Sequence, residues 1–356
     1  MAGQNGVILY LKGLTKTFSG HAAVDNIDLE IQEGELFTIV GPSGSGKTTL
    51  LRMLAGMEAP SAGDIILRGE RINDIPANRR PTCMVFQSLA LFPHKEVGAN
   101  IEFALKIRGV DRETRRRRAL ELMALLRLPE TYYRRSVSMI SGGERQRVAL
   151  ARALAFDPEI LFFDEPLSAL DYKLRKTLEK ELKDIHRETR KTFVYITHSL
   201  EEAMVMSDRI GVMRSGKLVQ IGTPQEIYST PNCKFVSEFI GDVNMLPVKA
   251  VAPGRLASND VPGEIVAPAA NGPSEGYLVV RPEFVRFLSA PGEADNHVVG
   301  RLYNEYALGS RIQYQVRVGE QVFVVEKLRH EAFQGRLDQE VTIGWDAADS
   351  IVVADT

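Results

Sequence analysis

Cysteine is scarce in this sequence of 356 residues, because only Cys83 and Cys233 occur and they lie far apart. Two such residues form neither a disulfide framework nor the spacing of a metal site, and they fit a reducing cytosol. An excess of charge of one sign is also lacking, since 44 basic residues stand against 46 acidic ones. No field of the whole chain therefore attracts nucleic acid or anionic lipid, and such a partner would need a local patch.

Long apolar runs and internal repeats are lacking as well. No stretch approaches the roughly 18–20 apolar residues that cross a bilayer, so work at a membrane would require other chains to cross it. Residues 1–10 lack a basic segment leading into an apolar one, and we expect no secretory signal. No repeat of fixed period appears, which argues against solenoids and propellers. The length and the 44% hydrophobic content predict an ordinary globular protein of two or three domains.

The pattern of apolar residues predicts two domains of different class. Between about residues 9 and 239, short β-rich runs alternate with helical patterns, which is typical of a sheet covered by helices. After about Asp242, proline and glycine interrupt the chain and short alternating runs follow, which favours a small β-barrel-like domain. Four runs have the character of strands buried on both faces: Leu36–Val40, Cys83–Phe86, Ile160–Phe163 and Thr192–Thr197.

A glycine-rich loop follows the first of these strands. Glycines five apart, then lysine and threonine, fit the phosphate-binding loop, whose backbone N–H groups turn inward toward phosphates. Lys47 can reach the β- and γ-phosphates, and Thr48 can bind Mg²⁺. A strand before the loop and an apolar helix after it disfavour an ordinary glycine turn. The candidate nucleotide-binding residues are Gly41, Pro42, Ser43, Gly44, Ser45, Gly46, Lys47, Thr48 and Thr49.

Polar residues follow the other three predicted strands. Asp164 and Glu165 come after Ile160–Phe163 and are candidates for the magnesium ligand and for the residue that orients the attacking water. Gln87 and His198 end the remaining two strands, and we interpret His198 as a contact of the γ-phosphate. The carboxyl ends of parallel strands meet at one edge of a sheet, so these residues are expected to form one pocket.

Structural alternatives exist for several of these polar segments. An acidic pair such as Asp164 and Glu165 also occurs in solvated turns, and Ser199 and Glu202 have the spacing of a capping box at the helix after His198. The segment Ser141-Gly142-Gly143-Glu144 also has capping-box spacing. Its two glycines leave bare N–H groups at a helix start, which would alternatively make a second anion site.

Taken together and in this order, these motifs resemble the ATPase subunit of ABC transporters. The resemblance covers about residues 9–240 and implies an α/β P-loop ATPase domain over 1–240, with a helical subdomain at about 91–150. It implies that the protein hydrolyses ATP with Mg²⁺. The matching segments are GPSGSGKTT from Gly41, FQ at Phe86, SGGERQRVALARAL from Ser141, LFFDEPLSALD ending at Asp171, and TH at Thr197.

The resemblance also assigns roles to single residues. Phe18 would stack on adenine, Gln87 would sense Mg²⁺ and the membrane partner, and Asp171 would cross between subunits. Ser141, Gly142, Gly143 and Glu144 would form the signature motif. Members of the family clamp ATP between the phosphate loop of one copy and the signature of another, so a homodimer is implied. Glu144 replaces the usual glutamine, and we expect it to keep the helix cap.

Three further segments are MVFQSLALFPHKEVGANI from Met84, PLSALDYKLR from Pro166 and SDRIGVMRSGKLVQIGTPQEIYSTP from Ser207. They resemble one group of bacterial importers, those for polyamines, ferric iron, maltose and related solutes. These proteins carry a C-terminal TOBE-like domain, which the tail at 241–356 resembles, and the junction at 241–247 is most similar to that of spermidine/putrescine transporters. The resemblance implies two integral membrane permease subunits, a solute-binding protein, and a place at the cytoplasmic face of the bacterial inner membrane. Ferric iron, sugar or another small solute is the alternative cargo.

Two surface segments admit more than one interpretation. Leu91, Phe92 and Pro93, within Ala90–His94, would offer an apolar surface to a membrane subunit, or would only fill the core. The arginines at 112 and 115–118 favour a rival class, a soluble ABC-type ATPase that acts on nucleic acid or ribosomes. Because Asp111 can cap that helix and the arginines can form its solvated face, we expect no nucleic-acid partner.

Overall fold

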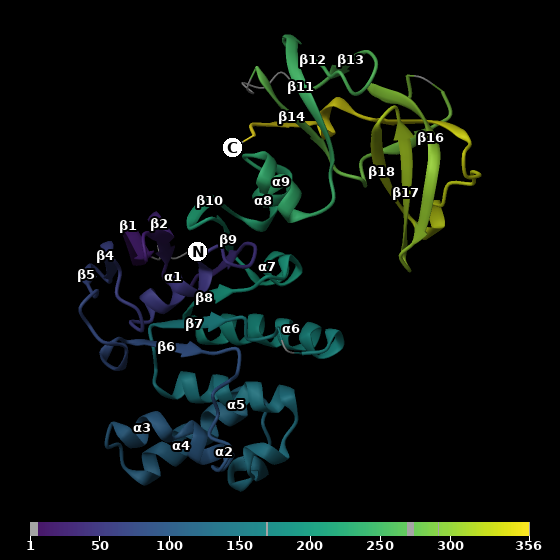
Figure 1. The fold of residues 1–356 in the computed structure, drawn as a ribbon. Coiled ribbons are helices and arrows are strands. Elements are labelled where there is room, and N and C mark those ends of the chain that lie inside the picture. The colour runs from purple at the N-terminus through teal and green to yellow at the C-terminus, as the bar shows by residue number, and fades with distance from the viewer. Residues whose placement is uncertain (1–5, 169, 269–273, 291, 356) are drawn as a thin grey trace. The chain divides into compact units, whose positions relative to one another are not determined.

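The computed structural model describes residues 6–168, 170–268, 274–290 and 292–355. The chain forms two compact units, Met1–Gln225 and Glu226–Thr356 (Figure 1). The sequence placed the boundary between residues 240 and 241, which differs from this division. The reason is Arg281, a buried side chain of the second unit that donates hydrogen bonds to the carbonyls of Tyr228 and Ser237 and so binds the preceding helical segment to that unit.

A parallel sheet forms the centre of the N-terminal unit. In the described residues it has six strands, of which β6, β7, β8, β3 and β9 run parallel and β10 antiparallel. Every residue of β3 and β8 is buried, as expected for strands covered on both faces. The order across the sheet is β10 (Lys217–Gly222), β9 (Arg209–Arg214), β3 (Leu36–Val40), β8 (Thr192–Ile196), β7 (Ile160–Asp164) and β6 (Thr82–Val85). The predicted strands are therefore confirmed, with shifts of a residue at some ends.

Two apolar clusters cover this sheet, and alternate strand residues belong to each. Leu161 and Phe163 of β7 pack with helices α4 (Arg112–Leu125), α5 (Gly142–Ala155) and α6 (Tyr172–Thr189). Ile160 and Phe162 pack with α1 (Lys47–Leu54) and a second sheet. The second sheet is antiparallel, and the sequence analysis did not predict it. Its order is β2 (His21–Gln32), β1 (Val7–Phe18), β4 (Ala62–Leu67) and β5 (Glu70–Arg71).

The structure contains the helices expected after the phosphate loop, at Asp111 and at Ser141. Asp111 accepts a hydrogen bond from the Thr114 N–H and caps α4, and Arg115 and Arg118 pair with Glu102 and Glu121. The arginines at 112 and 115–118 therefore belong to one helix, α4, which Asp111 caps. The helical elements are α1 (Lys47–Leu54), η1 (Ala77–Arg79), α2 (Val97–Ile101), α3 (Phe103–Ile107), α4 (Arg112–Leu125), η2 (Glu130–Arg134), η3 (Val137–Met139), α5 (Gly142–Ala155), α6 (Tyr172–Thr189) and α7 (Leu200–Met206).

The C-terminal unit is built of antiparallel strands, as the sequence predicted. Its described residues form two five-stranded sheets that share one apolar cluster around Trp345. One sheet contains β13 (Glu264–Val266), β12 (Arg255–Ala257), β11 (Asn244–Ala252), β14 (Glu275–Val280) and β20 (Ile351–Val353). The other contains β15 (Arg286–Leu288), β19 (Glu340–Trp345), β16 (Asn296–Ala307), β17 (Arg311–Val318) and β18 (Gln321–Leu328). The remaining elements are α8 (Pro224–Ser229), α9 (Lys234–Ile240), η4 (Arg329–Glu331) and η5 (Ala347–Asp349).

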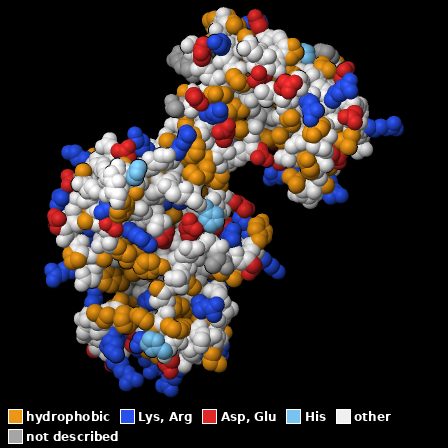
Figure 2. All heavy atoms as spheres, viewed as in Figure 1, with side chains coloured by type: hydrophobic (Ala, Val, Ile, Leu, Met, Phe, Trp, Pro, Cys, Tyr) orange, Lys and Arg blue, Asp and Glu red, His pale blue; other side chains and the backbone are white. Residues whose placement is uncertain are grey.

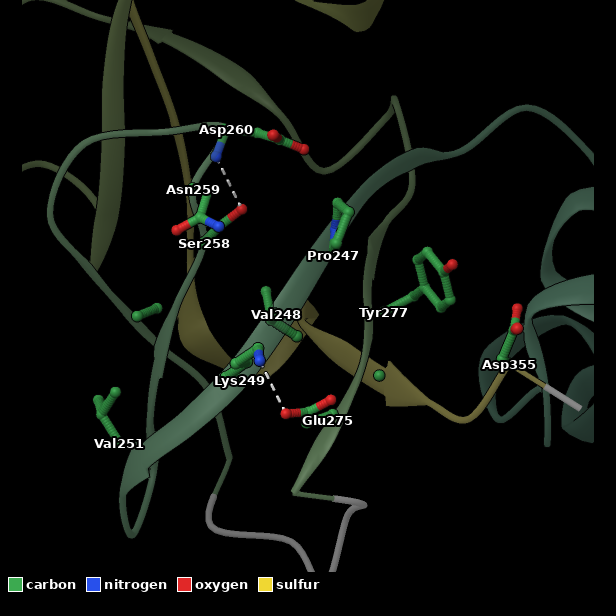
Figure 3. A pocket seen from close by; sticks show the side chains of 12 residues that line it. Pro247, Val248, Lys249, Val251, Ser258, Asn259, Asp260, Glu275, Tyr277 and Asp355 are labelled. Atoms are coloured by element: carbon green, nitrogen blue, oxygen red, sulfur yellow. Dashed lines mark hydrogen bonds and ion pairs between the residues drawn. The ribbon is translucent and has the colours of Figure 1, made fainter.

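A groove of about 610 Å³ opens on the C-terminal unit beside β11, β12 and β14 (Figure 3). Lys249 and Glu275 form an ion pair of 2.8 Å at its edge, and the Lys234 ammonium lies 4.1 Å from the ring of Tyr277. None of the groove's lining residues is one that the sequence assigns to nucleotide binding.

Among the residues that the structure describes, no helix is long and apolar enough to cross a membrane.

Candidate nucleotide site

The candidate residues meet because of the order of strands in the central sheet. β3, β8, β7 and β6 are consecutive parallel neighbours, so the segments that follow them begin at the same edge. These segments contain Gly41, His198, Glu165 and Gln87, and Asp164 is the last residue of β7. The edge is the one at which ligands bind in open α/β sheets.

The phosphate loop is shaped by close backbone contacts that only glycine permits. A Cβ at Gly46, where φ is +104°, would lie 2.1 Å from the Ala23 carbonyl oxygen. A Cβ at Gly41 would lie 2.2 Å from the Met213 carbonyl oxygen. Pro42, Ser43 and Gly44 are exposed at the tip of the loop. The loop therefore has a fixed shape with an open tip that leads into α1.

Lys47 lies inside this loop. Its Nζ donates hydrogen bonds to the Gly41 and Pro42 carbonyls, at 2.8 and 2.9 Å, and the residue is only 6% exposed. Burial lowers the pKa of the Lys47 ammonium, while Glu165 and Asp164 act in the opposite direction. A buried ammonium with two carbonyl partners is well placed to exchange them for phosphate oxygens.

Thr48 and Asp164 form the candidate magnesium site. The Thr48 hydroxyl donates a hydrogen bond of 3.3 Å to Asp164 Oδ1. Among the described residues, no group of three or more His, Cys, Asp and Glu side chains could hold a metal. One carboxylate and one hydroxyl nevertheless fit Mg²⁺, which is commonly bound by few protein oxygens together with phosphates and water.

Replacing Asp164 with asparagine is expected to stabilise the nucleotide-free protein although it removes ATP hydrolysis. Burial raises the pKa of Asp164, so the folded state binds this proton more tightly than the unfolded state and loses stability as pH rises through the raised pKa. Asparagine stays neutral, and we expect a Tm about 2 °C higher at pH 8 and a smaller difference at pH 5. Thermal unfolding measures this. Asp74→Asn, at an exposed carboxylate, is the control, and a lower Tm at pH 8 would contradict the expectation.

Glu165 is held by its backbone in an unusual conformation. Its φ is +46°, in the left-handed region that few non-glycine residues adopt, and its N–H donates a hydrogen bond to the Ile196 carbonyl. The Glu165 carboxylate lies 3.0 Å from His198 Nδ1. Ser168 Oγ donates to the Glu165 carbonyl and accepts from the Gln87 side chain at 2.9 Å. The structure thus brings Glu165, His198 and Gln87 together through contacts within one chain.

The helix after His198 begins differently from the prediction. Ser199 Oγ accepts a hydrogen bond from the Glu202 N–H, as in a capping box. The Glu202 carboxylate accepts instead from Tyr195 and Thr197, so the second half of the predicted capping box is wrong. The physical reason is that two buried hydroxyls compete for this carboxylate.

The capping box at the signature segment is complete, as predicted. Ser141 Oγ accepts from the Glu144 N–H, and the Glu144 carboxylate accepts from the Ser141 N–H at 2.8 Å. This backbone hydrogen bond lowers the pKa of Glu144. The expectation that Glu144 keeps the helix cap is confirmed. A Cβ on Gly143 would lie 3.0 Å from Leu174, so this helix start also packs closely on α6.

Phe18 and Asp171 lie outside the contacts described so far. Phe18 is 46% exposed at the end of β1, and the Lys16 ammonium lies 4.9 Å from its ring. Its hairpin continues into Ala23, whose carbonyl adjoins Gly46, so the ring lies on a segment next to the phosphate loop. The Asp171 carboxylate accepts a hydrogen bond from the Leu174 N–H and caps α6.

Two arginines that the sequence did not single out support the site, the buried Arg80 and the partly buried Arg152. Arg80 donates to the Met53 and Leu54 carbonyls at the C-terminal end of α1, where a cation is favourable. Arg152 of α5 donates to the carbonyls of Leu89 and Ala90, just after Gln87. A single arginine in a sequence gives no pattern that predicts such distant carbonyl partners.

Comparison with known proteins agrees with the geometry. The ABC transporter family matches residues 24–168, and the TOBE domain matches residues 278–353. The spermidine/putrescine import ATP-binding protein PotA of Trichodesmium erythraeum (strain IMS101) is 41% identical over 97% of this chain and 94% of its own length. PotA of Rubrobacter xylanophilus is 42% identical over 98% and 94%.

Solved structures match the ATPase part. A dimeric ATP-binding cassette in a post-hydrolysis state, bound to ADP and Pi, has a TM-score of 0.53 and 33% identity over 61% of this chain and 99% of its own. cbiO1 from Clostridium perfringens, part of an ABC transporter complex, has a TM-score of 0.58 and 25% identity over 66% and 92%. This chain therefore belongs to the ATP-binding, ATP-hydrolysing subunits of ABC transporters, with an α/β ATPase domain followed by a TOBE domain.

Proposed function

We propose that this chain energises the import of the polyamines spermidine and putrescine through membrane-spanning partner subunits, at the cytoplasmic face of a bacterial inner membrane. The observation that carries the proposal is the similarity to spermidine/putrescine import ATP-binding proteins, which extends over nearly the full length of both chains. The geometry of the nucleotide site supports the ATPase activity. For the cargo, this similarity favours polyamines over ferric iron or sugar.

The chain's own residues divide the work of hydrolysis. The N–H groups of the phosphate loop and the Lys47 ammonium bind the phosphates. Thr48 and Asp164 would hold Mg²⁺, which supplies neutralisation of phosphate charge. Glu165 orients the attacking water and accepts its proton, and His198, 3.0 Å from Glu165, contacts the γ-phosphate. Gln87 donates a hydrogen bond to Ser168, which in turn donates one to the Glu165 carbonyl. Through this link, Gln87 would transmit the state of the nucleotide site to the segment that follows it.

ATP is held between two copies of this chain in the proposed mechanism. Each copy contributes a phosphate loop and the helix start at Ser141, whose following glycines present N–H groups at the positive end of α5. Support comes from a related cassette that is dimeric in its solved structure. Phe18 would stack on adenine, and Asp171 would lie at the crossing between the copies.

The segment Ala90–His94 is the proposed contact with a permease subunit. Its shape is fixed, because Asn100 is fully buried and hydrogen-bonds both the N–H and the carbonyl of Phe92. Leu91 packs on the apolar core and Phe92 lies 4.4 Å from Phe103, so these two also fill the core. Pro93 is exposed. Figure 2 shows hydrophobic side chains gathered on the N-terminal unit in the region between β6 and α3.

Pro93→Glu is expected to uncouple transport from hydrolysis. A charge on this exposed residue would oppose an apolar contact with the membrane subunit, whereas a charge at the half-buried Phe92 would also disturb packing on Phe103. We expect ATP-driven uptake by membrane vesicles to fall about tenfold, as for a lost interface anchor, and the ATPase rate of the isolated protein to stay unchanged. Pro129→Glu, at an exposed proline before η2, is the control. Full uptake by the Pro93 variant would refute the contact.

Co-purification tests the proposed transporter. The tagged protein is extracted gently from its native membranes and every accompanying chain is identified by mass spectrometry. We expect two integral membrane proteins together with a solute-binding protein. Ribosomal or DNA-associated chains without membrane proteins would instead favour the soluble ATPase class.

A further inference from the structure

A buried carboxylate accepts a hydrogen bond from the residue that precedes His198. Glu202 of α7 is 2% exposed, and its Oε2 accepts hydrogen bonds from the Tyr195 hydroxyl at 2.9 Å and the Thr197 hydroxyl at 2.8 Å. The Thr197 Oγ1 in turn accepts a hydrogen bond of 2.9 Å from the Ser199 N–H. The two residues that flank His198 are therefore joined to each other, and through Thr197 to one buried carboxylate.

The same carboxylate faces a charged side chain of α6. Arg175 Nε lies 3.9 Å from Glu202 Oε1, and Arg175 Nη2 donates a hydrogen bond of 2.9 Å to the Leu170 carbonyl. Leu170 belongs to the segment that follows Glu165. A second buried carboxylate, that of Glu179, lies on the same helix and pairs with Lys176. The segment that carries His198 thus contacts this network of charges through Thr197, and the segment that follows Glu165 contacts it through Leu170.

Stability alone gives a poor account of this network. Burial raises the pKa of Glu202, which shows that its charged form is costly where it lies. Arg175 Nε and Glu179 Oε1 have no hydrogen-bond partner among the described residues. An incompletely satisfied buried network is a cost that functional sites commonly carry.

We infer that Thr197 and Glu202 are positioning residues that hold the His198 imidazole toward Glu165 and the γ-phosphate. The inference deepens the proposed function and rests on the proposed role of His198. His198 itself is 57% exposed, so little packing holds its ring. The Thr197 hydroxyl fixes the backbone on both sides of the imidazole, and Glu202 fixes that hydroxyl. A misplacement of about 1 Å at a reacting centre can cost 10²-fold in rate.

Thr197→Val tests the inference, because valine keeps the shape of threonine and removes both hydrogen bonds. We expect kcat for ATP to fall at least about tenfold while KM stays within about twofold, and Thr197→Ser to restore kcat to within about twofold. Thr192→Val is the matched control. Thr192 is a buried threonine at the other end of β8 that accepts the Gly34 N–H, and its loss should lower the Tm without lowering kcat.

His198→Ala separates the inference from the proposed function. If the positioning acts through His198, the double variant Thr197→Val/His198→Ala hydrolyses ATP no more slowly than His198→Ala alone. An unchanged rate in His198→Ala would overturn the role of His198 and the inference with it. A slow His198→Ala beside a Thr197→Val variant as fast as Thr192→Val would overturn the inference only.

Variants of Glu202 provide a second test, which can be carried out even where Thr197→Val folds poorly. Glu202→Gln keeps an acceptor oxygen for Thr197 and should retain kcat to within about threefold, whereas Glu202→Ala should lose about tenfold. Glu188→Gln, at an exposed carboxylate near the end of α6, is the control. Equal kcat in Glu202→Ala and Glu202→Gln would contradict the inference.

Discussion

Glu165→Gln is expected to reduce ATP hydrolysis by about 10³-fold, the scale of a lost general base, and to leave ATP binding intact. Glutamine keeps the size of the side chain and an oxygen for His198, but it cannot accept a proton from water. The backbone hydrogen bond from Glu165 to Ile196 and the left-handed φ do not depend on the carboxylate, so the strand end should keep its shape. Steady-state hydrolysis and equilibrium binding of labelled ATP measure the two effects.

This variant also tests the proposed dimer. Bound ATP that is not hydrolysed should hold two copies together, so the Glu165 variant with ATP and Mg²⁺ should sediment as a dimer and the nucleotide-free protein as a monomer. Glu201→Gln, with its exposed carboxylate on α7, is the control for both measurements. Hydrolysis at the wild-type rate would remove Glu165 from its catalytic role.

Lys47→Ala is expected to weaken ATP binding about 100-fold, since hydrogen bonds to charged groups contribute about 1.5–3 kcal/mol each. The Lys47 ammonium lies inside the loop, where it is held by the Gly41 and Pro42 carbonyls. The loop should survive the change, because close contacts at Gly41 and Gly46 determine its shape. Calorimetric titration with ATP measures the affinity.

An exposed lysine serves as the control for this prediction. Lys217 is 64% exposed on β10 and pairs with Asp25, so Lys217→Ala should bind ATP as the unchanged protein does. An ATP affinity of Lys47→Ala within threefold of the control would show that the ammonium is not a phosphate ligand.

The sequence was most informative where local pattern and function coincide. The strands Leu36–Val40 and Thr192–Ile196 are short runs rich in apolar, β-branched and aromatic residues, which predicts strands buried on both faces, and every residue of both is buried. The residues that follow such strands in a parallel sheet share one edge, which is why Glu165 and His198 could be expected to meet. The contact between their side chains confirms that expectation.

Features that depend on distant pairing could not be predicted in the same way. The antiparallel sheet pairs Leu9 with Leu67 although β2, β3 and α1 lie between them in the sequence, and shifts of register in β1 break the simple alternation of its residues. Glu202 has the spacing of a helix cap but turns to Tyr195 and Thr197, because their buried hydroxyls compete for it. Likewise, the unit boundary depends on Arg281, whose carbonyl partners lie 44 and 53 residues earlier.

The central claim is that ATP hydrolysis by this chain drives polyamine import, and uptake by reconstituted vesicles tests it most directly. Membrane subunits that co-purify with the chain are placed in lipid vesicles with their solute-binding protein, ATP and labelled spermidine. The account predicts accumulation of spermidine with the unchanged chain, none with Glu165→Gln, and no competition by ferric iron or maltose. Equal accumulation with both chains, or ATP-driven accumulation of a different solute in place of spermidine, would contradict it.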